Sequence, residues 1–399
     1  MSPLDTFTSL SILATPPLAP RLKPPLTVGL NLIFLVPGET GGMEVYAREL
    51  IAAMAALAPA GTRFVAFINR EAADEPGPWR DLARPVVVGV RASKRSEWVR
   101  GEQVLLPRLA AREGVDLMHS LASTGPAWGR YRRIVTVHDL IYRRFPEAHA
   151  GLRALGMRVL VPLAVRRSDR VIADSTSTKQ DLVDLLGTPA SRIDVVPLGI
   201  GTLERVAPLP EPELRERFAL GERRVLLSLS AKRPHKNLAV LLEACALLEP
   251  RPILILGGYR TAYELELQER ARALGIADDV RWLGWLDGAE LEGLWRISAG
   301  FVFPSLYEGF GLPVLEAMAR GVAVACSTGS SLPEVAGDAA LLFDPGDPRA
   351  IADAIEQLLA GGPEIERLRA AGLRRAATFT WERTASLTLD SYARALADS

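Results

Sequence analysis

The chain alternates short, continuously apolar runs with segments of helical periodicity, and it does so in two rounds. In the first round an apolar run at 26–36 precedes a segment at 44–58 whose apolar residues recur at helical spacing. The second round begins at 223–231, after a pause at 199–221 that contains three prolines. Apolar strands separated by helices form parallel sheets covered on both faces. The pattern therefore predicts an α/β fold with two doubly wound sheets.

This alternation also suggests where domains begin and end. We expect a loose N-terminal tail at 1–25, a first domain at 26–198, a second at 199–379 and a closing helical segment at 380–399. The tail is rich in Pro, Ser and Thr and lacks the basic start of a signal peptide, so none is expected. The further strands read FVAFIN, PVVVGV, VDLMHS, RIVTVHD, RVIADS and RIDVVPL in the first round, and PILILGG, VRWLGW, GFVFPS and VAVACST in the second.

Composition excludes several classes of protein. Of the 399 residues, 48% are hydrophobic, yet no apolar run approaches the roughly 20 residues of a membrane helix. Only five of 47 basic residues are lysine, which argues against a nucleic-acid-binding tail. Cys245 and Cys326 lie in apolar runs, as buried thiols of a reducing, cytoplasmic compartment do.

Charge is unevenly distributed. Residues 1–198 carry 25 basic and 19 acidic residues, and the remainder carries the opposite excess, so the net charge is zero. One interpretation is that the basic half binds an anionic acceptor or a membrane surface. The alternative is that its excess charge only reflects an arginine-rich composition. A basic stretch within this half contains Arg91, Lys94, Arg95, Trp98 and Arg100. It is expected either to contact a membrane or a lipid phosphate or to form a solvated helix face.

Polar residues just after strands matter most, because ligands of open parallel sheets bind at the carboxyl ends of strands. Gly41 and Gly42 follow the first strand, where glycines let backbone N–H groups approach an anion or simply form a tight turn. His138 ends another strand and would donate to a hydroxyl or act as a base. His119 is its rival at a similar strand end, and Asp139 is interpreted as a cap of the next turn.

A basic cluster follows the first strand of the second domain. Lys232, Arg233 and Lys236 precede a helix that starts near Asn237. Three cations at a strand end suit a diphosphate, the alternative being a solvated basic loop. His235 is expected at the surface of this loop.

The segment 301–321 gives the most specific signal. A strand, a glycine-containing loop and a helix follow one another, and consecutive N–H groups in the loop would form an anion-binding nest ahead of the helix. These groups belong to Gly309, Phe310, Gly311 and Leu312. Glu308 precedes the nest, where it would accept hydrogen bonds from sugar hydroxyls. Glu316, expected in the first helical turn, either favours the helix dipole or accepts two bonds from a ribose diol.

The sequence PSLYEGFGLPVLEAMARG in this segment resembles the Glu-x7-Glu motif of retaining glycosyltransferases, and more narrowly family 4 of the group 1 enzymes. The resemblance covers nearly the whole chain from about residue 26. It includes GETGGMEVYAREL, the HDL segment, ADSTSTKQDLV, DVVPLGI, KRPHKN and a terminal TWERTA helix. It implies the GT-B fold, in which two Rossmann-like domains face each other across a cleft and the last helix crosses back to the first domain.

The resemblance also implies roles for individual residues. Gly41 and Gly42 would lie near the donor phosphates or the acceptor. His138 matches the histidine that touches the transferred sugar, Lys236 the basic residue on the donor diphosphate, and Glu308 the glutamate at the sugar ring. The remaining matches are amides of Phe310, Gly311 and Leu312 on sugar and phosphates, and Glu316 on the ribose.

One position departs from the family pattern. Many members carry an arginine five residues before the lysine, where this chain has Ala231. Lys232 or Arg233 is the candidate replacement.

The implied function is transfer of a hexose, mannose by analogy, from a GDP- or UDP-sugar to a saccharide or lipid-linked acceptor. The anomeric configuration would be retained, and cations and amides would take the place of a metal ion. Loops near Trp282–Leu286 would read the base. The alternatives are a sugar-nucleotide 2-epimerase, which needs no acceptor, and a non-catalytic sugar-nucleotide binding protein. The expected location is cytoplasmic, with possible peripheral membrane contact and no nucleic-acid partner.

Overall fold

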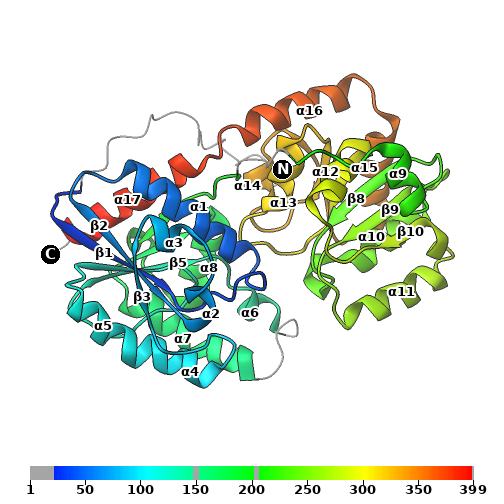
Figure 1. Ribbon diagram of the computed structural model, residues 1–399. Coiled ribbons are helices and arrows are strands. Elements are labelled where there is room, and N and C mark those ends of the chain that lie inside the picture. The colour runs from blue at the N-terminus through cyan, green and yellow to red at the C-terminus, as the bar shows by residue number, and fades with distance from the viewer. Residues whose placement is uncertain (1–21, 147–151, 202–205, 398–399) are drawn as a thin grey trace, which may run out of the picture.

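A computed structural model describes residues 22–146, 152–201 and 206–397. Its strands form two separate, wholly parallel sheets with helices on both faces, as the sequence predicted (Figure 1). In sheet order, the first contains β3 (Arg84–Val87), β2 (Thr62–Ile68), β1 (Leu26–Leu32), β4 (Leu117–Ser120), β5 (Arg132–Val137), β6 (Arg170–Ala173) and β7 (Ile193–Val195). The second contains β10 (Val280–Trp282), β9 (Ile253–Gly257), β8 (Val225–Leu229), β11 (Ser298–Phe303), β12 (Val324–Ser327) and β13 (Ala340–Phe343).

Helices connect the strands within each domain. The first domain has α1 (Gly42–Leu57), α2 (Arg70–Ala73), α3 (Pro78–Asp81), α4 (Arg95–Arg100), α5 (Leu106–Arg112), α6 (Ile141–Arg144), α7 (Leu152–Arg167) and α8 (Thr176–Leu186). The second has α9 (Glu211–Arg217), α10 (Leu238–Ala246), α11 (Tyr263–Ala273), α12 (Gly288–Ile297), α13 (Leu312–Ala319), α14 (Leu332–Ala336), α15 (Pro348–Ala360) and α16 (Pro363–Ala376).

Local chemistry sets several helix ends. Ser175 caps α8 by accepting a hydrogen bond from the Thr178 N–H, and Gly187 ends it in the left-handed conformation. Asp287 and Glu290 form a capping box at the start of α12. Such caps place the polar strand-end loops on fixed helix termini.

The last helix, α17 (Trp381–Ala397), returns to the first domain and packs on α1, β5 and β6 (Figure 1). Its chain crosses beside the other interdomain connection, because the Ile200 N–H donates to the Phe379 carbonyl at 3.0 Å. Gly199 is required there, since an added Cβ would lie 2.4 Å from the Trp381 nitrogen. The proposed domain boundaries stay predictions. Residues 1–21 of the expected tail lie outside the described residues, whereas Leu22 is buried in the first domain's core.

Candidate active site

The loop between β11 and α13 presents a row of free backbone donors. Within the described residues, the N–H groups of Gly309, Phe310, Gly311 and Leu312 have no protein acceptor. Gly311 is the N-cap of α13 with φ 120°, a conformation that favours glycine, and it provides no capping side chain. Unsatisfied N–H groups at a helix N-terminus bind anions, so the loop has the character of the expected nest. We call residues 309–312 the amide nest.

Serines of the loop after β12 hold the amide nest in shape. The Ser330 hydroxyl lies 2.7 Å from the Glu308 nitrogen and 2.9 Å from its carbonyl oxygen. The Ser331 hydroxyl lies near the carbonyl oxygens of Glu308 and Phe310, at 3.0 and 2.6 Å. Because the serines satisfy the carbonyl side of the loop, its N–H groups remain available.

Lys236 and Glu308 are brought together beside this nest. The Lys236 ammonium donates to the Glu308 carboxylate at 2.6 Å, and both side chains are less than one-fifth exposed. The ammonium also lies 5.5 Å from the Phe303 ring centre. A partly desolvated cation next to four amides is suited to a diphosphate.

His138 follows β5, as expected, but both of its ring nitrogens are occupied. Nδ1 lies 2.7 Å from an Asp174 carboxylate oxygen, and Nε2 lies 2.8 Å from the Leu121 carbonyl oxygen. Burial lowers the pKa of His138, but the Asp174 carboxylate and the acceptor at Leu121 outweigh burial and leave the pKa raised. Two acceptors require two N–H donors, so in this arrangement the ring is an imidazolium and has no lone pair to act as a base.

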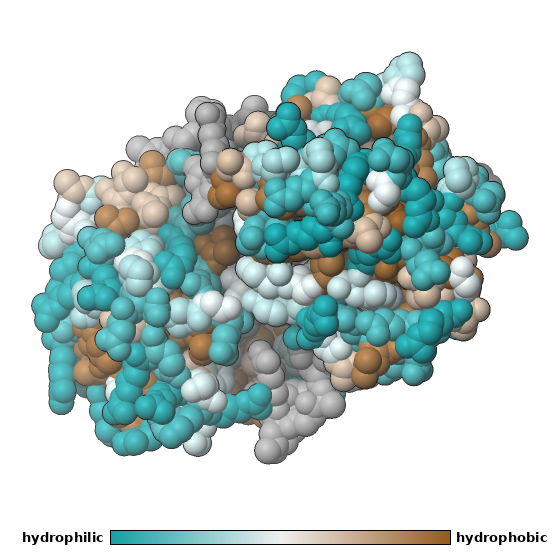
Figure 2. All heavy atoms as spheres, turned by 45° about the vertical axis from the view of Figure 1, so that its right-hand side comes forward, coloured by the Kyte–Doolittle hydropathy of each residue, from teal (hydrophilic) through white to brown (hydrophobic). Residues whose placement is uncertain are grey.

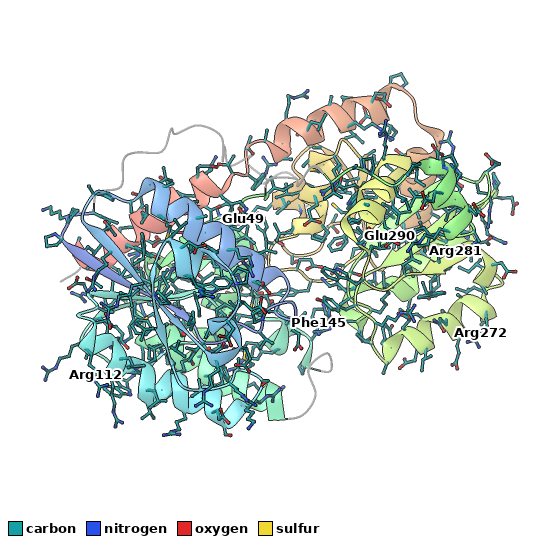
Figure 3. The ribbon with its side chains drawn as sticks, in the orientation of Figure 1. Glu49, Arg112, Phe145, Arg272, Arg281 and Glu290 are labelled. Atoms are coloured by element: carbon teal, nitrogen blue, oxygen red, sulfur yellow. The ribbon has the colours of Figure 1, made fainter. Side chains whose placement is uncertain are left out.

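The amide nest and His138 meet across the domain gap. An added Cβ on Gly309 would lie 1.9 Å from the His138 carbonyl oxygen, so the two backbones are in direct contact. The Gly309 carbonyl accepts hydrogen bonds from Ser175 and Thr178 of the first domain, at 2.7 and 3.1 Å. Phe145, at the junction of the domains in Figure 3, lies 6.0 Å from the Tyr307 ring.

Further hydrogen bonds join the two domains at the same edge of the gap. The Tyr307 hydroxyl donates to Asp181 at 2.7 Å and accepts from the Leu140 N–H at 3.1 Å. The Glu334 carboxylate accepts from the N–H and hydroxyl of Thr176 at the start of α8. The site is therefore assembled from both domains.

Glu316 does not lie where the sequence predicted. Since α13 begins at Leu312, Glu316 is in its second turn, beyond the reach of the strongest dipole effect. Burial raises the pKa of its carboxyl, and nearby Arg320 only partly opposes this because that guanidinium pairs with Glu292. The Glu316 carboxylate accepts no hydrogen bond within the described part of the chain, which leaves it free for a hydroxyl ligand.

The basic loop separates its two candidate cations. The Lys232 side chain is fully buried, and its ammonium donates to carbonyl oxygens of Gly258 and Leu283. Burial lowers the Lys232 pKa to about 8. This orientation argues against Lys232 as a phosphate ligand. Arg233 is partly exposed, and its guanidinium has no hydrogen bond or ion pair to any described residue, so it remains the candidate for the role missing at Ala231.

Gly41 and Gly42 lie at the start of α1, with open space where a Cβ of either would stand. Gly41 has φ 62°, which favours glycine. The carbonyl of Gly38, in the same loop, faces the Tyr259 hydroxyl of the second domain at 3.4 Å. The glycine loop thus borders the gap.

Three further expectations have clear outcomes. His235 is buried rather than at the surface, because its carbonyl accepts from Leu306 and Ser305 and its ring packs 6.3 Å from Phe145. His119 is no rival for His138: it is buried between Tyr392 and Thr136, and burial lowers its pKa to about 3. Asp139 accepts a hydrogen bond from the Ile141 N–H at the first residue of α6, although Leu140 is the residue at the cap position of that helix.

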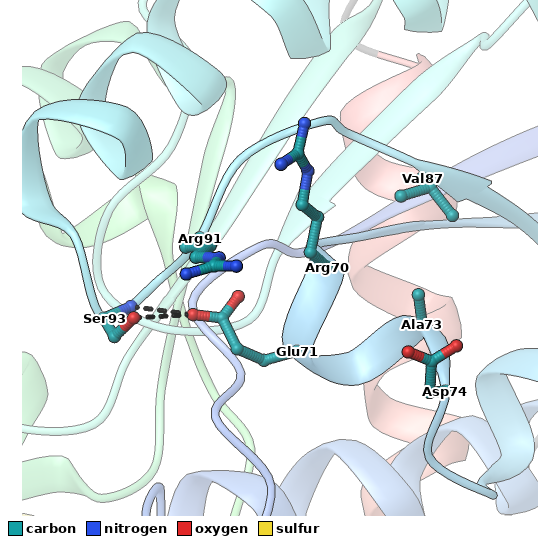
Figure 4. Close-up of a pocket in the computed structure, with 7 residues that line it drawn as sticks. All are labelled: Arg70, Glu71, Ala73, Asp74, Val87, Arg91 and Ser93. Carbon is teal, nitrogen blue, oxygen red and sulfur yellow. Dashed lines mark hydrogen bonds between the residues drawn. The ribbon is translucent and has the colours of Figure 1, made fainter.

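Some surface features lie away from the gap. Figure 2 shows a mostly hydrophilic face with scattered apolar atoms. Two shallow hollows lie elsewhere on the first domain, one of them lined by Arg70, Glu71, Ala73, Asp74, Val87, Arg91 and Ser93 (Figure 4). In the latter, Glu71 is held by Ser93. Among the described residues, no helix has the length and apolarity of a membrane span, and no cluster of three acidic, His or Cys side chains suits a metal ion.

Sequence reasoning missed the residues that orient the site. Asp174 directly follows β6 and would have been found by the strand-end rule that located His138. Ser330, Ser331 and Tyr307 carry no comparable local signal, because their partners lie on other strands' loops.

Comparison with known proteins agrees with this geometry. Residues 210–375 match the family described as Glycosyl transferases group 1, and residues 40–202 match Glycosyltransferase Family 4. The chain is 34% identical over 270 residues to O-antigen chain mannosyltransferase B of Escherichia coli, covering 65% of this chain and 70% of that one. It is 30% identical over 400 residues to the D-inositol 3-phosphate glycosyltransferase of Thermobispora bispora, covering 90% and 91%.

Among solved structures, HepE of Anabaena in complex with UDP-glucose aligns with a TM-score of 0.68 at 18% identity, over 94% of this chain and all of that one. The expected GT-B fold is thereby confirmed, with its two facing Rossmann-like domains and returning helix. The chain belongs to family 4 of the group 1 glycosyltransferases and is a transferase of that fold.

Proposed function

We propose that this protein transfers a hexose, with mannose favoured, from a nucleoside diphosphate donor to a hydroxyl of a saccharide or lipid-linked acceptor, with retention at the anomeric carbon. The observation that carries the proposal is the amide nest, with its unsatisfied N–H groups beside Lys236 and Glu308, in contact with the loop of His138. The mannosyltransferase relative supports the sugar and an acceptor of the polysaccharide type. The UDP-glucose complex of HepE supports the class of donor.

Fixed positive groups carry the chemistry in this proposal. The acceptor oxygen attacks C1 from the side of the departing phosphate, the bond from C1 to the phosphate oxygen breaks, and the acceptor proton passes to the leaving diphosphate. Negative charge then grows on the β-phosphate, where the nest amides, Lys236 and Arg233 stabilise it without a metal ion. Since these donors are already oriented, little reorganisation is needed during the reaction.

Glu308 and His138 act on the sugar rather than as bases. A diphosphate that draws Lys236 toward itself releases the Glu308 carboxylate from its ion pair, so that it accepts from sugar hydroxyls. The His138 imidazolium contributes positive charge near the sugar. The contact between the His138 backbone and Gly309 brings the two domains together around the donor. Closure excludes water and limits donor hydrolysis. Glu316, with its unbonded carboxylate, takes the ribose diol.

A two-part experiment tests this function. Thermal shift with UDP, GDP and their sugars identifies the donor, since a ligand at 100 times its Kd stabilises by about 2.7 kcal/mol. Transfer to oligosaccharide and lipid-linked acceptors then follows, with the anomeric configuration of the product read by NMR. Retention is expected, and an inverted product would contradict the proposed mechanism.

Two variants test the site. Lys236→Met should lower kcat/KM at least about 100-fold, as loss of an oxyanion donor does. Glu308→Gln, which removes the charged acceptor for the sugar hydroxyls, should cause a loss of about the same size. Glu364→Gln is the matched control, because Glu364 pairs with Arg367 on the exposed face of α16. Full activity in both site variants would remove Lys236 and Glu308 from the mechanism.

A further inference from the structure

One buried ammonium joins three neighbouring strand ends in the second domain. Lys232 follows β8, and its side chain donates to the Gly258 carbonyl at 2.8 Å and the Leu283 carbonyl at 2.7 Å. Gly258 comes directly after β9, and Leu283 directly after β10. The side chain is completely buried, so water does not compete for these bonds.

Backbone contacts reinforce the same junction. The Lys232 N–H donates to the Tyr259 carbonyl at 3.2 Å, and its own carbonyl accepts from the Thr261 hydroxyl. Gly258 has φ 119°, and a Cβ there would lie 2.5 Å from the Ser230 carbonyl oxygen. These contacts therefore hold the loops after β8, β9 and β10 against one another.

Burying the Lys232 ammonium in this space carries a large desolvation cost. Its ammonium has no carboxylate within hydrogen-bond distance in the described structure, and Glu264 acts on it only through space. A methionine of similar length would fill the volume without the desolvation penalty. What the ammonium adds is a fixed direction for two carbonyl groups.

The loops that Lys232 holds expose two aromatic rings. Tyr259 and Trp285 are 45% and 75% exposed, and their ring centres lie 5.2 Å apart. The Tyr259 hydroxyl reaches the Gly38 carbonyl of the opposite domain, so this pair borders the domain gap. Stacking of a nucleobase on an aromatic side chain is worth about 1–3 kcal/mol.

The sheet order gives the direction of the donor. Lys236 follows β8 and the amide nest follows β11, so the diphosphate lies at the ends of these two central strands. On the β12 side, Ser330 and Ser331 pack on the nest. On the other side of β8, the sheet continues with β9 and then β10. Two strand spacings amount to about 10 Å, which is about the length of a nucleoside.

We infer that Lys232 is a positioning residue for the nucleoside half of the donor: it holds the loops after β9 and β10, with Tyr259 and Trp285, as the wall that receives the base. This inference rests on the proposed function. It assigns Lys232 to the base end of the donor rather than to the diphosphate.

Calorimetric titration with UDP, GDP and inorganic pyrophosphate tests the assignment. Lys232→Met should raise the Kd of whichever nucleotide the wild type binds more tightly at least 10-fold and leave the Kd of pyrophosphate within 2-fold. Donor KM should rise by the same factor, with kcat within 3-fold. Lys179→Met is the matched control, since Lys179 also donates to a backbone carbonyl, that of Ile193 in the first domain, and it should change neither ligand.

Trp285→Ala tests the same wall without touching the buried charge and should reproduce the nucleotide-selective loss. An equal loss of pyrophosphate affinity in Lys232→Met would make Lys232 a phosphate ligand and overturn the inference. An unchanged nucleotide Kd in Trp285→Ala, or in a folded Lys232→Met, would overturn it as well. If the wild type binds neither nucleotide nor pyrophosphate, the proposed function itself fails, and the inference fails with it.

Discussion

Gly309→Ala adds one methyl group at the point where the two domains touch. The new Cβ would stand 1.9 Å from the His138 carbonyl oxygen and 2.9 Å from its carbon, whereas real Cβ atoms essentially never come within 3.0 Å of another residue. The loops must therefore separate by about 1 Å. Neither loop yields easily, since Ser175 and Thr178 bond the Gly309 carbonyl from one side.

The expected effect is on catalysis rather than on folding. A misplacement of about 1 Å in a reacting constellation costs about 100-fold in rate, which corresponds to about 2.7 kcal/mol of transition-state stabilisation. The amide nest itself lies in the second domain and keeps its serine bonds. We therefore expect kcat/KM to fall at least 100-fold while the Kd of the nucleoside diphosphate changes less than 3-fold.

Steady-state transfer kinetics and calorimetry with the identified donor measure both quantities. Gly156→Ala is the control, because a Cβ at Gly156 in α7 meets no atom of a described residue within 4 Å. That variant should keep its activity and gain up to about 1 kcal/mol of stability from helix propensity. A Gly309→Ala enzyme with transfer within 3-fold of wild type would refute the argument that contact between nest and histidine loop organises the reaction.

Three further predictions concern buried groups. Burial raises the Glu102 pKa to about 7, so the free energy of unfolding of the wild type falls as pH rises through that value. In urea denaturation, the stability of Glu102→Gln relative to wild type should therefore increase by up to about 3 kcal/mol between pH 4 and pH 8. Tyr392→Phe leaves the Nδ1 of buried His119 without its partner and should cost about 1–3 kcal/mol in the same assay, an unchanged midpoint being the contrary result. Asp174→Asn removes the carboxylate that keeps His138 charged, so the alkaline fall of kcat/KM should move to lower pH; an unshifted profile would mean that His138 charge is not needed.

The sheets could be predicted from sequence because each parallel strand must be apolar on both faces, a property written locally in runs such as 26–36. The strand-end rule likewise located His138 and the nest, since parallel strands end at a common edge. The order of the motifs along the chain then identified the family.

Side-chain direction could not be predicted in the same way. Lys232 and Arg233 are neighbours in one basic loop, yet the first turns into the protein and the second stays partly exposed. The difference depends on carbonyl groups at Gly258 and Leu283, which only the packed sheet brings near. His138 is a similar case, because its protonation depends on Asp174 from the next strand of the sheet.

The most direct measurement is the position of a bound donor nucleotide, determined by crystallography of the complex with GDP or UDP. We expect β-phosphate oxygens about 3 Å from nitrogens of residues 309–312 and from the Lys236 ammonium. A diphosphate bound in the hollow lined by Arg70 and Arg91, with the amide nest empty, would contradict it.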